Sequence, residues 1–270
     1  MGSYQGRALH APDAARRTRR PWRVLARALL VALGVAVLAH VPWGGLRRRF
    51  AVVTHVRVEG ALYLDANQVF RRAALSRGDD LFRLDLRRAR QALLLDSRIA
   101  SAEVSRRLPR GVRIRIRERV PALLVHHGTP WELDGTGVLL QPLAQGVVAD
   151  VPMLVGPSFE RVPAGTQVAS PQVARGLAWS EALSKQVLQL TGQVSELDVS
   201  RDDTTGITLL DGTRVLGPAW PPSVRRLSAL RVVLADLRQK GTAAEEIDLR
   251  FEHQVIVRPL PLPGSEDRKG

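Results

Sequence analysis

The chain of 270 residues contains no cysteine and few aromatic residues, which make up 4% of the total. Without cysteine there is no disulfide bond, no thiolate nucleophile and no cysteine-ligated metal. Lysine is scarce as well, because arginine outnumbers it 37 to 3, a bias typical of a GC-rich genome rather than of one chemistry. The length allows two small domains plus additional segments.

The residue types that carry catalysis or bind metals are present, but their spacing does not fit either role. Six histidines are scattered without an HExxH pattern, and His126 and His127 would point to opposite faces of a strand. Neither a P-loop nor a GxSxG motif occurs. Asp134 and the pair at 202–203 lie in turns, where aspartate has a backbone role. The sequence therefore argues against an enzyme and implies no cofactor or metal.

Positive charge is concentrated in the first half of the chain. The net charge is +14, with +6 in residues 1–27, +11 in residues 47–119 and −3 in residues 120–270. Single-strand nucleic-acid binders combine basic grooves with aromatic stacking platforms. No aromatic residue lies between Phe82 and Trp131, so the basic region does not predict nucleic-acid binding. A surface beside an anionic bilayer and a solvated strand face remain as explanations.

One long segment near the N-terminus lacks formal charge. No Asp, Glu, Lys or Arg lies between Arg27 and Arg47, and 19 helical residues span roughly 28 Å, close to the bilayer core. Trp22 and Trp43 flank the segment as interfacial anchors would. We expect a transmembrane helix at 24–46, with the basic tail 1–23 in the cytoplasm and the rest exported. The alternative is a cleaved signal peptide, with a small-residue cleavage site at 37–39.

Residues 50–119 predict a small domain with the element order β-α-α-β-β. Residues 52–58 (VVTHVRV) read as a strand, and Asp65 and Asp85 are good helix N-caps. A hairpin follows, with strands at 99–107 and from residue 111 and a Pro-containing turn between them. The two helices are therefore expected to cover one face of the sheet.

The last strand of this domain, GVRIRIRERV, alternates strictly. Ile114 and Ile116 fall on one face, and four arginines fall on the other: Arg113, Arg115, Arg117 and Arg119. Glu118 interrupts the apolar face, and Pro121 ends the ladder because it has no N–H. The row of arginines is open to three partners: lipid, another protein or water.

Residues 120–258 predict a second domain, rich in strands and with two helices. Ser170 and Ser223 are the expected N-caps, and the stripe that we expect on the first of these helices includes Trp179, Leu183, Val187 and Leu190. Strands are expected at 123–127, 131–133, 138–140, 194–199, 207–210 and 214–216, and a closing hairpin at 247–251 and 254–258. The tail 259–270 is rich in Pro, Gly and charge and is expected to be disordered.

Several stretches resemble the FtsQ family of bacterial cell-division proteins, called DivIB in many Gram-positive bacteria. They are residues 56–60 (VRVEG), 118–122 (ERVPA), 133–138 (LDGTGV), 225–237 and 247–251 (IDLRF), in this order after one apolar run. The first domain resembles a POTRA domain of envelope proteins, with 78–86 (GDDLFRLDL) connecting its helices. The resemblance covers roughly residues 20–258.

This resemblance implies an α+β protein with one transmembrane helix, a POTRA domain and a mixed β-sheet domain. It also implies a non-enzymatic scaffold of the inner membrane and division septum that links early division proteins to the FtsB–FtsL pair and septal peptidoglycan synthesis. In the family FtsB adds a strand to the sheet edge, which edges permit. The implied binding residues are Leu249, Arg250, Phe251, Gln254, Val255, Ile256, Val257 and Arg258, and Glu118 and Pro121 mark the domain junction.

Two other classes of protein remain as alternatives. A POTRA-containing protein for translocation or outer-membrane assembly would normally continue into a barrel, and it would lack the LDGTG and IDLR stretches. A secreted envelope enzyme would need a catalytic group of residues, which the sequence does not offer.

Overall fold

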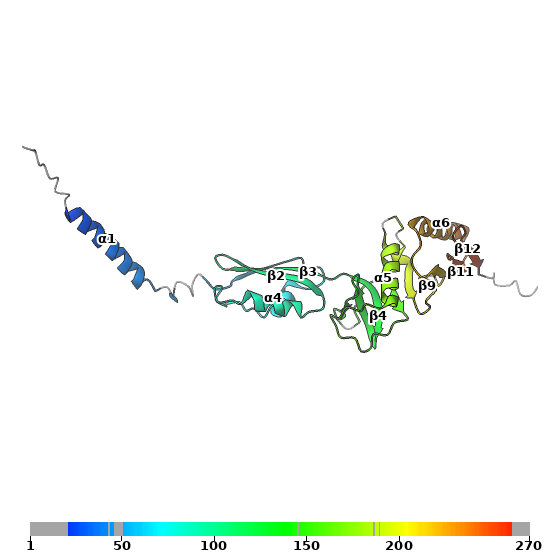
Figure 1. The fold of residues 1–270 in the computed structure, drawn as a ribbon, viewed down its shortest axis with the longest axis horizontal. Helices are drawn as coiled ribbons and strands as arrows, with labels where there is room; N and C mark the ends of the chain where they lie inside the picture. Colours follow the sequence, from blue (N-terminus) through cyan, green and yellow to red (C-terminus); the bar gives the residue numbers. More distant parts are fainter. Residues whose placement is uncertain are drawn as a thin grey trace, which may run out of the picture. The chain divides into compact units, whose positions relative to one another are not determined.

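A computed structural model describes residues 21–42, 44–45, 51–144, 146–185, 187–188 and 190–260. The chain divides into two units, Met1–Phe50 and Ala51–Gly270 (Figure 1). In the first unit, helix α1 spans Pro21–His40, and its window Trp22–His40 is long and apolar enough to cross a membrane. The helix thus starts three residues before the start of the expected span 24–46 and ends six residues before its end. Trp43 and most of the basic tail lie outside the described residues.

The second unit begins with a three-stranded sheet covered by two helices. Its elements are β1 (His55–Glu59), α3 (Ala66–Arg72), α4 (Leu86–Leu94), β2 (Ile99–Arg107) and β3 (Gly111–Glu118). The strand order is β1-β3-β2, with β1 parallel and β2 antiparallel to β3. Asp65 and Asp85 cap the helices by accepting from Asn67 N–H and Arg88 N–H, each at 2.9 Å. The expected β-α-α-β-β order is confirmed.

The alternation of β3 places its isoleucines in the core of this first domain. Val112, Ile114 and Ile116 are buried against residues of both helices, including Val69 and Leu93. On the opposite face, Arg113 and Arg115 lie 3.6 and 3.4 Å from the carboxylate of Glu59 on β1. The arginine row is therefore partly paired within the domain itself.

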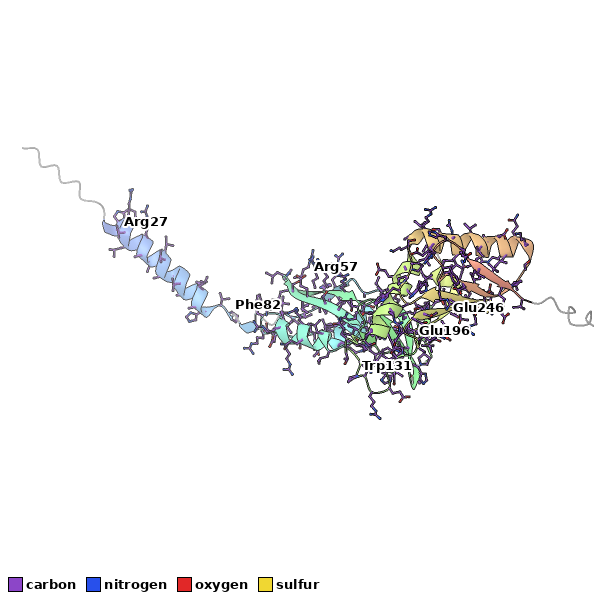
Figure 2. All side chains as sticks on the ribbon, turned by 45° about the vertical axis from the view of Figure 1, so that its right-hand side comes forward. Arg27, Arg57, Phe82, Trp131, Glu196 and Glu246 are labelled. Atoms are coloured by element: carbon purple, nitrogen blue, oxygen red, sulfur yellow. The ribbon has the colours of Figure 1, made fainter. Side chains whose placement is uncertain are left out.

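The second domain contains one nine-stranded sheet. Its strands are β4 (Pro121–His127), β5 (Thr129–Asp134), β6 (Leu139–Leu140), β7 (Met153–Val155), β8 (Val194–Asp198), β9 (Thr204–Leu209), β10 (Arg214–Pro218), β11 (Ala244–Asp248) and β12 (Ile256–Pro259). The spatial order is β12-β11-β10-β9-β8-β7-β4-β5-β6, so β12 and β6 are the two ends. Glu196 and Glu246, labelled in Figure 2, lie on β8 and β11 of this sheet.

The β6 end of the sheet is closed by the chain itself. Leu139 N–H donates to Thr166 O at 3.0 Å, and Gly165 N–H donates to Leu139 O at 2.8 Å. Val168 N–H donates to Gly137 O at 2.8 Å in the same segment. A backbone segment after β7 therefore occupies the groups that an end strand would otherwise present to solvent.

Two helices accompany the large sheet, α5 (Pro171–Ser184) and α6 (Val224–Lys240), with a short 3-10 turn η1 (Thr191–Gln193) before β8. Trp179 and Leu183 of α5, and Leu227, Leu230 and Leu234 of α6, are buried in one core. The predicted apolar stripe of α5 is wrong beyond Leu183. The helix ends at Ser184 because Lys185 turns to extended backbone, so Val187 is exposed and Leu190 is buried outside the helix.

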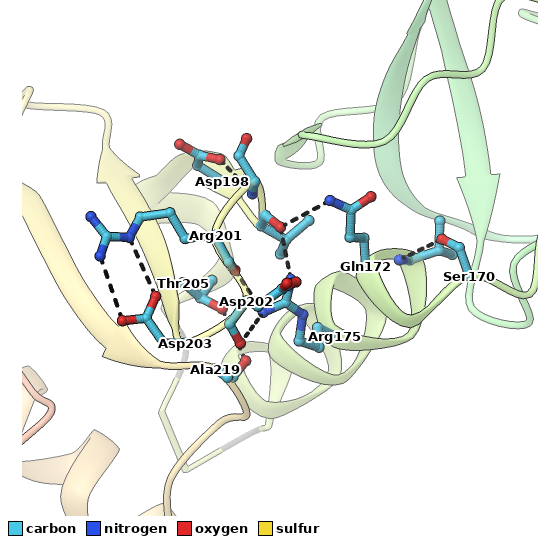
Figure 3. Close-up of polar contacts among 12 residues, drawn as sticks. Ser170, Gln172, Arg175, Asp198, Arg201, Asp202, Asp203, Thr205 and Ala219 are labelled. Atoms are coloured by element: carbon cyan, nitrogen blue, oxygen red, sulfur yellow. Dashed lines mark hydrogen bonds and ion pairs between the residues drawn. The ribbon is translucent and has the colours of Figure 1, made fainter.

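A buried arginine fixes the loop between β8 and β9 (Figure 3). Arg175 of α5 donates from its guanidinium to the carbonyls of Val199 at 2.8 Å, Arg201 at 2.7 Å and Asp202 at 2.8 Å. Ser170 caps the same helix by accepting from Val173 N–H at 3.1 Å. Because burying an unpaired charge is costly, the three carbonyls make this arginine part of the fold of the domain.

Candidate protein-interaction site

Strand β12 lies at one end of the nine-stranded sheet. In the described part of the chain it pairs only with β11, antiparallel, in the register Asp248–Ile256, Ile247–Val257 and Glu246–Arg258. Leu260 N–H donates to Ala243 O at 3.0 Å, and Leu249 N–H donates to Leu216 O of β10 at 2.8 Å. Since backbone groups alternate sides along an antiparallel strand, those of Ile256 and Arg258 face β11. The N–H and C=O groups of Val257 therefore point away from the sheet.

The side chains of β12 also alternate. Val257 is partly buried and packs on the core of the domain, as does Val255 just before the strand. Ile256 is 45% exposed. Arg258 is exposed and lies 3.4 Å from Glu246 of β11. Of the implied binding residues, Ile256 and Arg258 are thus directly accessible, whereas Val255 and Val257 also support the fold.

The segment before β12 is a loop, so the expected strands at 247–251 and 254–258 are wrong in their bounds. Strand β11 ends at Asp248 and β12 begins at Ile256. The side chain of Leu249 is fully buried in the core of the domain. Phe251 and Gln254 lie in the exposed loop.

The turn that ends β11 is stabilised by an aspartate. Asp248 accepts from Arg250 N–H at 2.9 Å and from its guanidinium Nη2 at 2.6 Å. The hydrogen bond from the Arg250 side chain lowers the pKa of Asp248, and the carboxylate raises the pKa of Arg250 in turn. Both groups are therefore charged at neutral pH, and the guanidinium of Arg250, although 42% of its side chain is exposed, is bound to the aspartate of its own turn.

An open groove lies between the start of α6 and the loop that precedes β12. Its volume is about 820 Å³. Its lining is mostly polar and includes Arg225 and Arg226 on α6, and Glu252 and His253 on the loop. This groove was not predicted from the sequence. A signal for it is present in the sequence, since the two arginines lie outside the buried stripe Leu227–Leu230–Leu234 of α6 and therefore face solvent. The groove brings two cations together with Val255, the residue directly before β12.

The two residues expected at the domain junction have distinct roles. Glu118 at the end of β3 is 5% exposed, and its carboxylate accepts three backbone N–H groups: Leu62 at 3.0 Å, Tyr63 at 3.0 Å and Leu64 at 3.1 Å. It therefore holds a loop of the first domain. Pro121 begins β4 and pairs with Asp134 of β5.

Two arginines of the first domain bind carboxylates of the second. Arg119 Nη1 lies 2.7 Å from Asp134 Oδ2, and Arg98 Nη2 lies 2.6 Å from Glu132 Oε2. The second pair is almost completely buried, with 5% and 1% of the side chains exposed. Glu132 also accepts from Ala149 N–H at 2.9 Å. Sequence reasoning missed the Arg98 pair because its partner lies 34 residues away.

The carboxylate of Asp134 accepts hydrogen bonds from the turn that follows it. Burial by itself would raise the pKa of this carboxyl, but hydrogen bonds from Val138 N–H, from Thr136 and from Arg119 together lower the pKa below its ordinary value. The distances are 2.9 Å to Val138 N and 2.8 Å to Thr136 N. No group of three or more potential metal ligands occurs among the residues that the structure describes.

Comparisons with known proteins agree with this layout. Residues 52–119 match the family model described as "POTRA domain, FtsQ-type", and residues 122–250 match "Cell division protein FtsQ/DivIB, C-terminal". The second match ends before β12.

Several relatives that align along most of the chain are named cell division protein FtsQ. The chain is 26% identical to the cell division protein FtsQ of Syntrophotalea carbinolica, over 90% of each chain. It is 29% identical to FtsQ of an Anaeromyxobacter species, over 93% of this chain and 87% of the relative. It is 27% identical to FtsQ of Geotalea daltonii, over 78% of this chain and 77% of the relative.

One apolar helix, a POTRA domain and a β-sheet domain fit a membrane-anchored division protein. Together the two family models cover most of the chain. The chain therefore belongs to the FtsQ/DivIB family of bacterial cell-division proteins, which is a non-catalytic family.

Proposed function

We propose that this protein is a scaffold of the septal division machinery that links early division proteins to FtsB and FtsL, and through them to peptidoglycan synthesis. Helix α1 would anchor it in the cytoplasmic membrane, with the basic tail 1–23 inside and both folded domains outside. Membership of a non-catalytic division family supports a role in assembly rather than in chemistry.

The observation that carries this proposal is the open edge of β12. Its outward N–H and C=O groups have no strand beside them in the described part of the chain, whereas each inner strand of the sheet has two neighbours. An extended peptide satisfies such groups by adding a strand, and alternate side chains then provide selectivity. FtsB is the partner that we assign to this edge.

Side chains around the edge suit a partner strand with acidic flanks. Ile256 offers an exposed apolar contact beside the added strand. Arg225 and Arg226 line the adjoining groove and would pair with carboxylates. The apolar centre and charged surroundings are the usual anatomy of a protein interface.

A substitution at Ile256 tests the placement. Ile256→Glu puts a charge into the apolar contact, and we expect FtsB recovery with the full chain from membranes to fall by about 30-fold, the size of a hot-spot loss. Because Ile256 is exposed, the unfolding temperature should not change. Val232→Glu is the matched control, since Val232 is exposed on α6 but does not line the groove. Undiminished FtsB recovery with Ile256→Glu would refute this interface.

The proposed topology has a separate test. The chain has no cysteine, so single cysteines can be labelled selectively. Leu210 is exposed in the second domain. In spheroplasts, an impermeant maleimide should label Leu210→Cys, and Ser3→Cys should be labelled only after lysis. The reverse pattern would contradict the topology, and loss of residue 3 from the mature chain would indicate a cleaved signal peptide.

A further inference from the structure

One end of the first domain is built from three segments that lie side by side, and we call it the tip. Leu81 N–H donates to Ala51 O at 2.7 Å, which joins the start of the domain to the loop before α4. Thr54 N–H donates to Arg110 O at 2.9 Å, which joins the same start to the β2–β3 turn. Arg106 then donates from Nε to Leu81 O and from Nη2 to Leu84 O, both at 2.7 Å. The tip is thus a fixed surface.

The tip exposes apolar side chains. Leu108, in the β2–β3 turn, is 66% exposed, and Phe82, in the loop before α4, is 52% exposed. Figure 2 shows Phe82 projecting at an end of this domain. A leucine and a phenylalanine on neighbouring loops are the residue types that enter the boundary between lipid headgroups and acyl chains.

Arginines surround these two side chains. The tip segments 76–88 and 106–110 contain seven arginines and three aspartates, a net charge of +4. Each aspartate also accepts a backbone N–H within the tip: Asp79 from Ser76, Asp80 from Phe82 and Asp85 from Arg88. The carboxylates thus serve the local backbone, while the side chains of Arg77, Arg107 and Arg110 are exposed. Each cation near an anionic lipid surface contributes about 1 kcal/mol.

The tip is also the part of the domain that is tethered to the apolar helix. Only residues 41–50 separate α1 from Ala51, and a chain of ten residues spans at most about 35 Å. The other end of the domain, where β3 meets the second domain, is about 25 Å further along the strands. With α1 in a bilayer, a short tether keeps the tip at a high effective concentration near the headgroups.

We infer that the tip, through Leu108, Phe82 and the exposed Arg77, Arg107 and Arg110, docks on the anionic lipid surface of the membrane that holds α1. This goes beyond the proposed scaffold role and rests on it only in taking α1 as an anchor. Apolar side chains within a basic surround fit a lipid interface better than a purely polyanionic polymer, which offers no apolar phase. Docking would fix the height of the second domain above the membrane.

The test uses the full chain in lipid nanodiscs. Leu108→Cys, labelled with an environment-sensitive fluorophore, should shift to the blue and be quenched by doxyl lipids in phosphatidylglycerol-rich discs. Leu95→Cys is the matched control, because Leu95 is 88% exposed at the other end of α4 and its label should stay in water. Co-elution of the chain with the discs reports insertion of α1 separately, so failure of the anchor and failure of the tip are distinguished.

Charge variants complete the test. Removing one arginine should lower the ratio of docked to free tip about fivefold, so Arg77→Gln/Arg107→Gln/Arg110→Gln should lower it about 100-fold. The control Arg57→Gln/Arg115→Gln/Arg117→Gln removes the same charge from the outer face of the sheet and should leave docking unchanged. Equal quenching in phosphatidylcholine discs would overturn the inference. So would a Leu108 label that responds to soluble cell-wall polymer and not to lipid.

Discussion

Replacing Glu118 by glutamine should loosen the first domain at one identifiable loop. The carboxylate accepts three consecutive N–H groups, with Oε1 bound to Leu62 and Leu64 and Oε2 bound to Tyr63. In Glu118→Gln one oxygen keeps its two donors, but an amide NH₂ then faces the N–H of Tyr63. A donor meets a donor in a site that is 5% exposed.

The magnitude follows from the loss of one acceptor and of the charge on the other. An unsatisfied buried donor costs about 1–3 kcal/mol, and neutral hydrogen bonds are about half as strong as charge-assisted ones. Part of this loss is offset because a neutral amide is easier to bury than a carboxylate. We expect the free energy of unfolding to fall by about 2–3 kcal/mol, which lowers the melting temperature of such a small domain by about 10–20 °C.

Hydrogen exchange locates the effect. Protection of the amides of residues 62–64 should fall by about 30–100-fold, because 1.4 kcal/mol corresponds to a factor of ten. Glu103→Gln on β2 is the matched control, since Glu103 is 65% exposed and its pairing with Arg115 is a surface interaction worth little. If the protection at 62–64 is the same in Glu118→Gln and in the control, the carboxylate does not hold this loop.

Three further predictions concern other contacts. Arg98→Ala leaves the Glu132 carboxylate buried without its partner and should lower the free energy of unfolding by about 3–5 kcal/mol. In calorimetry, Arg98→Met/Glu132→Leu should recover most of this lost stability, because no charge is then left buried. A double variant that is no more stable than the single variant would contradict this prediction. Because the folded pKa of Asp134 is lowered, its stabilising effect is complete above about pH 4 and is lost as the pH falls below that value. Asp134→Asn should flatten that acid limb of the stability curve, and an unchanged slope would refute the assignment. Gly60→Ala, at φ +83°, brings a Cβ into the carbonyl oxygen of Ile116 on β3. It should cost about 2 kcal/mol more in urea unfolding than Gly212→Ala, where φ is +86° and no atom lies within 4 Å.

Local patterns were enough to predict most of the first domain. The alternation of Ile114 and Ile116 with arginines predicted both faces of β3, because strand periodicity depends only on neighbours along the chain. The caps at Asp65 and Asp85 are equally local and are present as predicted. Gly241 ends α6 in a left-handed conformation, as a C-terminal glycine does.

Contacts between distant segments could not be predicted in the same way. The apolar spacing of Trp179 and Leu183 continues into residues 187 and 190, but the backbone leaves the helical conformation at Lys185, so Leu190 reaches the core from outside the helix. Arg175 looks like any surface helix arginine until the carbonyls of the β8–β9 loop meet it. At the interaction site, the hairpin was predictable from its alternation, but its bounds depend on the Asp248 turn.

The two ends of the large sheet differ in what they can accept. The β6 end is closed by the hydrogen bonds of Leu139 and Gly165, while no strand of the described residues lies beside β12 at the other end. A sheet with two open ends can stack with copies of itself into an unlimited ribbon. A sheet with one free edge has room for one added strand at that edge, and growth would stop there. A chain built in this way can gather at a crowded site without polymerising through its sheet.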